Sequence, residues 1–178
     1  MAQNVLTFEV QLADVDGGRY ETLDFRLAWH PSETEHYLVT RALAYCLSYT
    51  SGITLSPGLC AGDEPPIYIM SDDGRRLAWI DVGRPPPNRI RKAAISCERV
   101  CVFTWRDPNE VHRHVVADVR HRSRLEVVGI ESDLVYALAA DLKRRNLWSV
   151  TVSGGHVYVA DGSNEVGGAL TRVQETAG

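Results

Sequence analysis

Acidic side chains stand at the ends of three elements that the sequence predicts. Glu33 lies in the first turn of a predicted helix, and Asp81 lies near the end of a predicted strand. Asp63 and Glu64 come just before another predicted strand. Carboxylates that are gathered in one place repel one another unless a cation or a proton joins them, and Mg²⁺ prefers such oxygen ligands. The pattern therefore favours a divalent-metal site made of these acids.

Basic side chains follow Asp81 closely along the chain. Arg89 and Lys92 lie on a predicted helix that must start near the end of the Asp81 strand. A carboxylate-bound Mg²⁺ can activate a water and neutralise a phosphate, while lysine or arginine stabilises the charge that develops in the transition state. Paired carboxylates with a cationic side chain nearby are therefore typical of phosphoryl chemistry.

A predicted hairpin relates two of the acids. Strands are expected over 67–70 and 77–82, and the Asp-Asp-Gly sequence between them is a strong turn signal. If the turn is centred on its two aspartates, paired residues have numbers that sum to about 145, which sets Glu64 opposite Asp81. Asp63 would then point to the other face, but two following prolines make the register uncertain. Either acid can therefore be the partner of Asp81, with Glu64 favoured.

Two of these acids also have ordinary structural explanations. Ser32, with Glu35 three residues later, reads as a capping box, which predicts Ser32 as the N-cap of the helix. Glu33 would then simply interact favourably with the positive N-terminal end of the helix dipole, without any role in a site. Asp81 lies in an apolar run, where an unpaired charge is costly to bury. A metal, or a plain salt bridge to Arg89, would remove that cost.

The rest of the pattern predicts an α+β fold, with a central mixed β-sheet and flanking helices. Strands are expected over 5–12, 23–29, 67–70, 77–82, 100–103, 125–130, 148–152 and 156–160, and helices over 32–49, 88–97, 107–119 and 132–145. Because strands and helices alternate from residue 67 to residue 146, with antiparallel hairpins at both ends, we expect one domain over 1–163. The polar, glycine-rich segment 164–178 predicts a flexible tail.

Composition limits the classes of protein that the chain can represent. The 178 residues carry 19 Lys and Arg against 23 Asp and Glu, so any contact with nucleic acid must come from a local basic patch. The chain shows no secretory signal and no apolar run of about 20 residues, which predicts a cytoplasmic protein without a membrane segment. The four cysteines form no CxxC pair, so we expect buried, reduced thiols.

Four blocks of sequence, in their order and spacing, resemble the bacterial YaeQ family. The blocks are His30-Pro31-Ser32-Glu33-Thr34 followed by Arg41, Asp63-Glu64-Pro65, Trp79-Ile80-Asp81-Val82-Gly83 with Pro85, and Arg89-Ile90-Arg91-Lys92-Ala93. The similarity runs roughly from the first hairpin to the last. That family is regarded as a variant of the PD-(D/E)XK nuclease superfamily, so the resemblance implies a restriction-endonuclease-like core.

The resemblance also implies roles for the candidate residues. Glu33 would be the helix acid, Asp63 or Glu64 the first strand carboxylate and Asp81 the second, together holding Mg²⁺ or Mn²⁺. Gly83 stands where the superfamily has a lysine, so Lys92 or Arg89 would replace that lysine from the next helix. The expected function is a Mg²⁺-dependent nuclease that acts on nucleic acid. The alternative is a non-catalytic interaction or nucleic-acid-binding module that keeps the nuclease-like fold.

Overall fold

The computed structural model describes residues 4–57, 64–117, 119–120 and 122–175. Within these ranges the chain forms ten strands, four α-helices and a short 3₁₀ turn at Arg122–Arg124. The strands are β1 (Asn4–Asp14), β2 (Arg19–Trp29), β3 (Ile53–Leu55), β4 (Ile67–Met70), β5 (Arg76–Val82), β6 (Arg99–Thr104), β7 (Leu125–Ile130), β8 (Arg145–Ser153), β9 (His156–Ala160) and β10 (Glu165–Gln174). The helices are α1 (Glu35–Leu47), α2 (Pro87–Ser96), α3 (Pro108–Val116) and α4 (Ser132–Ala140). None of the described helices combines the length and the apolar character that crossing a bilayer requires.

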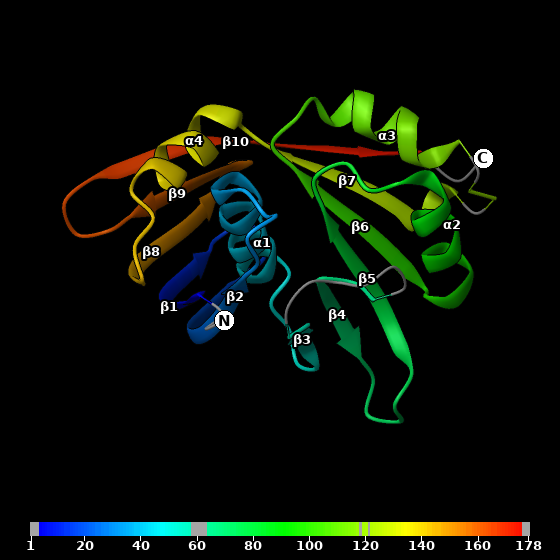
Figure 1. Ribbon diagram of the computed structural model, residues 1–178, viewed down its shortest axis with the longest axis horizontal. Helices are drawn as coiled ribbons and strands as arrows, with labels where there is room; N and C mark the ends of the chain where they lie inside the picture. Colours follow the sequence, from blue (N-terminus) through cyan, green and yellow to red (C-terminus); the bar gives the residue numbers. More distant parts are fainter. Residues whose placement is uncertain (1–3, 58–63, 118, 121, 176–178) are drawn as a thin grey trace.

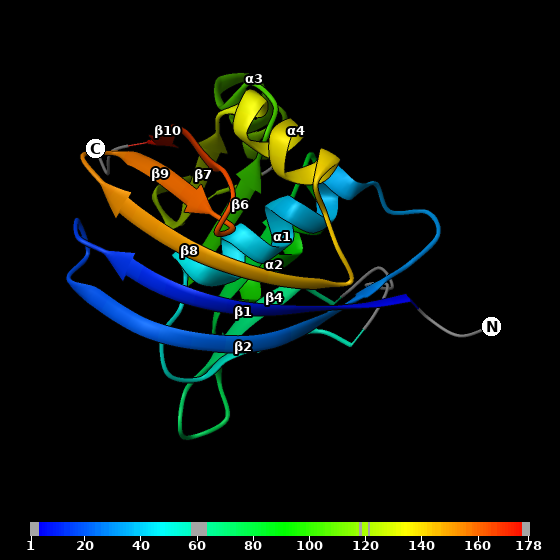
Figure 2. The same cartoon turned by 90° about the vertical axis from the view of Figure 1, so that its left-hand side faces the viewer.

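The strands form one mixed sheet in the order β2-β1-β8-β9-β10-β7-β6-β5-β4-β3. The pairs β1/β8, β5/β6 and β6/β7 are parallel, and the other neighbours are antiparallel. The sheet bends so that β1, β2, β8 and β9 form one half and β3–β7 the other, with β10 running across the top of both (Figure 1). Figure 2 shows α1 lying inside the bend. The predicted α+β class with a mixed sheet is thus confirmed.

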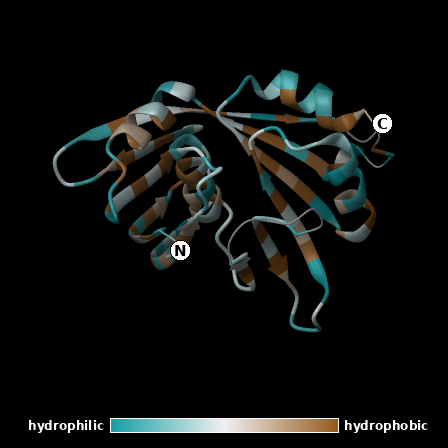
Figure 3. Ribbon diagram, in the orientation of Figure 1, coloured by the Kyte–Doolittle hydropathy of each residue, from teal (hydrophilic) through white to brown (hydrophobic). Residues whose placement is uncertain are grey.

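Two hydrophobic clusters hold the helices against the sheet. One side of α1, which includes Leu38 and Leu43, is completely buried inside the bend. It packs in one cluster with the apolar face of the first hairpin, which includes Phe8 and was predicted from the sequence. The second cluster joins α2 and α3 to the opposite face of β5–β7 and includes the fully buried Ile90 and Val111. Strands that are covered on both faces carry nearly continuous apolar sequence. Figure 3 shows such hydrophobic stretches along β6 and β7, while α3 carries hydrophilic residues on its outer side.

The parallel strands β5, β6 and β7 place their carboxyl ends at one edge of the sheet. These ends are Val82, Thr104 and Ile130, and α2, α3 and α4 begin shortly after them. The positive ends of three helices therefore lie along the same edge. Ligand sites in sheets with parallel strands commonly lie in a crevice beyond the carboxyl ends of the strands.

The segment after residue 164 differs from the predicted flexible tail. Glu165–Ala169 pairs with β9 and Leu170–Gln174 pairs with β7, so this segment fills the middle of the sheet. Two of its glycines are needed for close packing, because a Cβ added to Gly167 would lie 2.6 Å from Cδ1 of Tyr158 and one added to Gly168 would lie 2.9 Å from the Cβ of Glu131. The hydrogen bonds on both sides of β10, rather than its apolar content, hold this strand in place.

Candidate functional site

A pocket of about 630 Å³ opens at the carboxyl ends of β5 and β6. Its walls come from the start of α1, the end of β5, the beginning of α2 and the residues that follow β6. Four of the sequence-predicted site residues line it, namely Glu33, Asp81, Arg89 and Lys92. The fold therefore brings together acids and bases that are far apart in the sequence.

Asp81 is buried, with only 4% of its surface exposed, and its carboxylate is held by three groups. Its Oδ2 accepts hydrogen bonds from Trp79 Nε1 at 2.9 Å and from Arg89 Nε at 2.6 Å. Its Oδ1 accepts one from the backbone N–H of Val82 at 3.0 Å. The salt bridge to Arg89, which the sequence left open as an alternative to a metal, is therefore present.

Arg89 connects the pocket to the segment that precedes β4. One of its terminal nitrogens donates to the backbone carbonyl of Glu64, and its guanidinium lies 5.1 Å from the ring centroid of Trp79. Gly83 turns the chain from β5 towards α2 with a φ of +86°, and its N–H donates to the carbonyl of Phe103. Because side chains other than glycine rarely adopt this backbone conformation, a lysine at position 83 would be strained. Two basic side chains of the pocket, Arg89 and Lys92, come from α2.

Glu33 lines the pocket but does not belong to the helix that follows it. Helix α1 begins at Glu35, and Thr34 is its N-cap, with the Thr34 hydroxyl accepting from Tyr37 N–H at 3.2 Å. The prediction of Ser32 as the N-cap is therefore wrong. The backbone N–H of Ser32 donates to the His30 ring, and Glu33 closes a tight turn by donating its N–H to the His30 carbonyl.

That turn also holds the Glu33 side chain. Its Oε2 accepts from the backbone N–H of His30 at 3.2 Å, and the Glu33 carbonyl accepts from Trp29 Nε1 at 2.8 Å. Glu33 therefore reaches the pocket from a braced turn.

The predicted pairing of Glu64 with Asp81 is wrong. In the observed register Ile67 pairs with Ile80 and Tyr68 with Trp79, so paired numbers sum to 147 rather than 145. The register is offset because a bulge lies between Ile69 and Met70 and the connecting turn is longer than two residues. Glu64 precedes β4 and is exposed. Its backbone carbonyl accepts a hydrogen bond from Arg89, but Glu64 is not among the described residues that line the pocket. Asp63 lies outside the described residues.

Trp105 and Arg106, which were not among the predicted site residues, also line the pocket. Both follow directly after the buried strand β6, and Trp105 is half-buried while Arg106 is exposed. The signal that could have revealed them is their position, since polar or aromatic residues just after a buried parallel strand lie at the edge where ligands bind.

The two described acids of the pocket have the donor chemistry of a Mg²⁺ site. Among the described residues, Glu33 Oε1 accepts no hydrogen bond and Asp81 Oδ1 accepts only that of the Val82 backbone N–H. Mg²⁺ is often held by one or two carboxylates, with water and phosphate oxygens as its other ligands. The described residues contain no group of three His, Cys, Asp or Glu side chains that could hold a metal ion. The donors therefore fit a Mg²⁺ bound mainly through water and phosphate, rather than one enclosed by protein ligands.

The described cysteines take no part in the pocket. Cys46, Cys97 and Cys101 are buried and unpaired with one another, as the sequence predicted, while Cys60 lies outside the described residues. Burial raises the pKa of the Cys46 and Cys101 thiols well above its usual value, so both stay neutral and unreactive.

Comparison with known sequences links the chain to one family. A family model described as "YaeQ protein" matches residues 1–169. The "Uncharacterized protein YaeQ" of Escherichia coli (strain K12) is 26% identical over 174 residues, which cover 93% of each chain. The protein of the same description from Salmonella typhi is 26% identical over 171 residues, again 93% of each chain.

Comparison with solved structures gives the same result. The crystal structure of YaeQ protein from Pseudomonas syringae matches with a TM-score of 0.88 and 29% identity, covering 98% of this chain and 97% of that one. The crystal structure of the YaeQ protein from Xanthomonas axonopodis pv. citri also has a TM-score of 0.88 and 29% identity, covering 98% of this chain and 100% of that one.

Proposed function

Since this chain belongs to the YaeQ family, we propose that its pocket hydrolyses phosphodiester bonds of nucleic acid with the help of Mg²⁺. The observation that carries the proposal is that Glu33, Asp81, Arg89 and Lys92 line one pocket. We also propose that the fold is related to that of the PD-(D/E)XK nucleases, as the sequence motifs suggested. The protein would act in the bacterial cytoplasm, where nucleic acid is available.

The residues of the pocket divide into acids that hold a cation and bases that receive a phosphate. Glu33 and Asp81 would hold Mg²⁺, which supplies an activated water and neutralises phosphate charge. Trp79 and Arg89 fix the Asp81 carboxylate, so it needs little rearrangement. Lys92 and Arg89, from α2, would stabilise the charge that develops on the phosphate.

The start of α2 supports phosphate binding. Its first turn has no acidic residue, and Pro86 at its N-cap gives no side-chain cap. Asn88, in this first turn, lines the pocket. Pro86 and Pro87 carry no N–H and the N–H of Arg89 donates to the Pro86 carbonyl, so this helix start offers an anion the N–H of Asn88 and the positive potential of the helix end.

A second candidate is a binding module that keeps the fold without cutting. Two observations favour it. Arg89 already neutralises Asp81, and glycine occupies the position two residues after Asp81. Such a protein would bind nucleic acid or a protein partner through the same pocket.

A cleavage assay separates the two candidates. Purified protein is incubated with single-stranded and duplex DNA and RNA in Mg²⁺, in Mn²⁺ and in EDTA. The proposal expects cleavage that requires the metal and that falls roughly a hundredfold in Asp81→Asn and in Glu33→Gln. Glu9→Gln is the matched control, because Glu9 is an exposed acid on β1 that pairs with Arg145 in the other half of the sheet.

Each result of the assay has a defined meaning. Cleavage that survives EDTA, or that persists in Asp81→Asn, contradicts the proposed metal site. Binding of nucleic acid without cleavage under any of these conditions supports the module instead. Circular dichroism of each variant shows that a loss of cleavage does not reflect unfolding.

A further inference from the structure

Trp105 and Arg106 line two neighbouring pockets. The first is the site pocket, and the second has a volume of about 260 Å³ between the start of α3, the end of β7, the start of α4 and β10. Because β5, β6 and β7 are parallel, both pockets lie at the same edge of the sheet. Together they form a path that leads from Asp81 past Trp105 to the start of α4.

Basic side chains lie along this path. Arg89 and Lys92 line the first pocket, and Arg106 lines both pockets. The two acids of the second pocket are already engaged with backbone N–H groups, since Asp107 accepts from Asn109 and Glu131 accepts from Ala169. The positive ends of α2, α3 and α4 lie along the same edge. The path therefore offers the cations of Lys92 and Arg106 and the positive helix ends to a phosphate, beside acids that are held by Arg89 or by backbone N–H groups.

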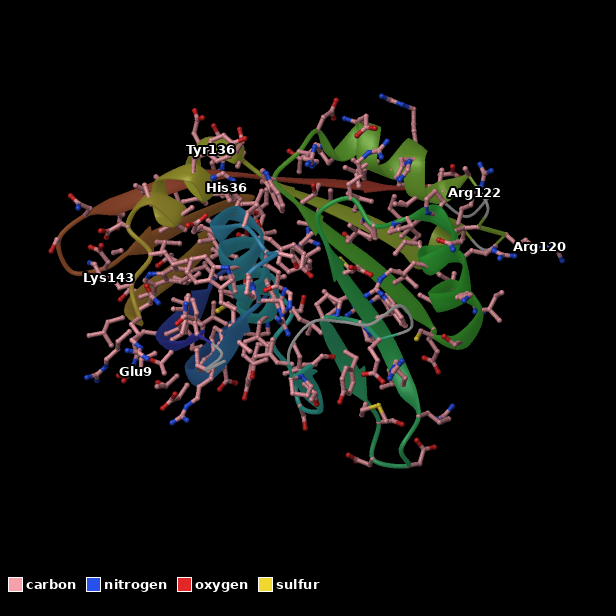
Figure 4. All side chains as sticks on the ribbon, viewed as in Figure 1. Glu9, His36, Arg120, Arg122, Tyr136 and Lys143 are labelled. Atoms are coloured by element: carbon pink, nitrogen blue, oxygen red, sulfur yellow. The ribbon has the colours of Figure 1, made fainter. Side chains whose placement is uncertain are left out.

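Aromatic rings continue from the pockets onto the surface. The ring centroids of Trp105 and His36 are 6.3 Å apart, and those of His36 and Tyr136 are 4.7 Å apart. The guanidinium of Arg106 lies 5.8 Å from the ring of Trp105, and Tyr136 is 46% exposed. Figure 4 shows His36 and Tyr136 next to each other where α1 and α4 meet. A half-buried tryptophan with an arginine beside it offers a stacking surface to a planar ligand.

We propose that this edge binds single-stranded nucleic acid, with a phosphate in the site pocket and a neighbouring base stacked on Trp105. The inference names the substrate class of the proposed function and rests on it for the position of the phosphate. In a duplex each base face is covered by the next base pair, whereas an unpaired base offers its face to an aromatic side chain. An aromatic ring at the entrance of a phosphate pocket therefore favours an unpaired strand.

Binding is measured by fluorescence anisotropy in EDTA, so that no metal-dependent cleavage occurs. The three probes are a labelled single-stranded DNA, its duplex and the same strand with abasic sites in place of bases. We expect the single strand to bind at least about tenfold more tightly than the other two. Trp105→Ala should weaken binding of the single strand by roughly tenfold or more and leave the other two unchanged. Tyr20→Ala is the control, because Tyr20 is an aromatic residue of β2 with 66% of its surface exposed.

A second readout separates stacking from a structural role of Trp105. Trp105→Phe keeps a ring, so its affinity for the single strand should stay within about threefold of the wild type. The quenching of tryptophan fluorescence by the single strand should decrease strongly in this variant, because a stacked base quenches the indole that it covers. Unchanged quenching in Trp105→Phe overturns the stacking assignment.

The outcomes also distinguish this inference from the proposed function. Equal affinity for duplex or abasic strand, or no binding of the single strand, overturns the inference even if the protein cleaves duplex DNA in Mg²⁺. If the single strand binds through Trp105 and no nucleic acid is cleaved, hydrolysis is overturned and the inference stands.

Discussion

Asp81 shows how a single charged residue is accommodated beside an apolar core. Its side chain is 5% exposed and that of Arg89 is 13% exposed, so neither charge is fully solvated. The hydrogen bonds from Trp79 and from the backbone of Val82 supply the remaining contacts of the carboxylate. A buried ion pair of this kind is stable only while both members are present, because removing one leaves the other charge buried and unpaired.

Removal of the Arg89 side chain should therefore destabilise the folded protein. We expect Arg89→Ala to lower the free energy of unfolding by roughly 3–5 kcal/mol. Arg84→Ala is the matched control, because Arg84 pairs with Glu110 where both side chains are about 40% exposed. This exposed pair should contribute much less to stability, because solvent screens its charges. Urea denaturation of both variants tests the difference, and equal losses would show that Asp81 does not depend on its partner.

The burial of a single residue, His112, makes the stability of the protein depend on pH. The residue is 7% exposed, its Nε2 has no hydrogen-bond partner among the described residues, and burial lowers its pKa below the ordinary value of 6.5. Below pH 6.5 the unfolded chain therefore binds a proton more readily than the folded one, so the stability contributed by neutral His112 is lost as the pH falls.

Thermal melting at pH 7.5 and at pH 5.5 measures this contribution. His112→Leu should reduce the difference between the two melting temperatures. His114→Gln, two residues further along α3, should leave the difference as in the wild type. A full difference in His112→Leu would assign the pH dependence to other groups.

At the scale of an element, the start of α1 depends on which hydroxyl caps the helix. Thr34 accepts the N–H of Tyr37, while the backbone N–H of Ser32 is held by the His30 ring. We expect Thr34→Ala to destabilise the protein by about 1 kcal/mol and Ser32→Ala to have an effect of less than about 0.5 kcal/mol. Chemical denaturation of the two variants compares them directly, and the reverse ranking would restore Ser32 as the cap.

The elements themselves were easier to predict than their exact ends and pairings. Period-two alternation identified the first hairpin, and the Asp-Pro pair identified Asp107 as the cap of α3, because both signals are local. The position of Glu64 relative to Asp81 was not predictable, because a single bulge changes the register. The same distinction holds for the site. The position of Glu33 and Asp81 at element ends suggested the pocket, whereas the position of Trp105 just after an apolar run points to a site only if that strand is known to be parallel to its neighbours.

At the scale of the whole molecule, β10 connects the two halves of the sheet. Its first five residues pair with β9 and its last five with β7, and β9 and β7 do not pair with each other. Figure 1 shows β10 as the red strand that crosses from one half to the other. The candidate site lies in the half of the sheet that contains β3–β7. Helix α1 supplies Tyr37 to the wall of this site, and it also packs against β1 and β2 of the other half. The geometry of the site therefore depends on the connection between the halves.

A chain that ends at Ser163 tests this dependence. Without β10, the edges of β9 and β7 lose their hydrogen-bond partners, and buried residues such as Val157 and Val128 become exposed. We expect this chain to be insoluble or to lack a cooperative thermal transition, because unpaired strand edges with apolar faces aggregate. A chain that ends at Glu175 keeps all of β10 and should melt like the full-length protein. If instead the chain ending at Ser163 melts cooperatively within a few degrees of the full-length protein, the two halves fold without their connecting strand, and 164–178 is the dispensable tail that its composition suggested.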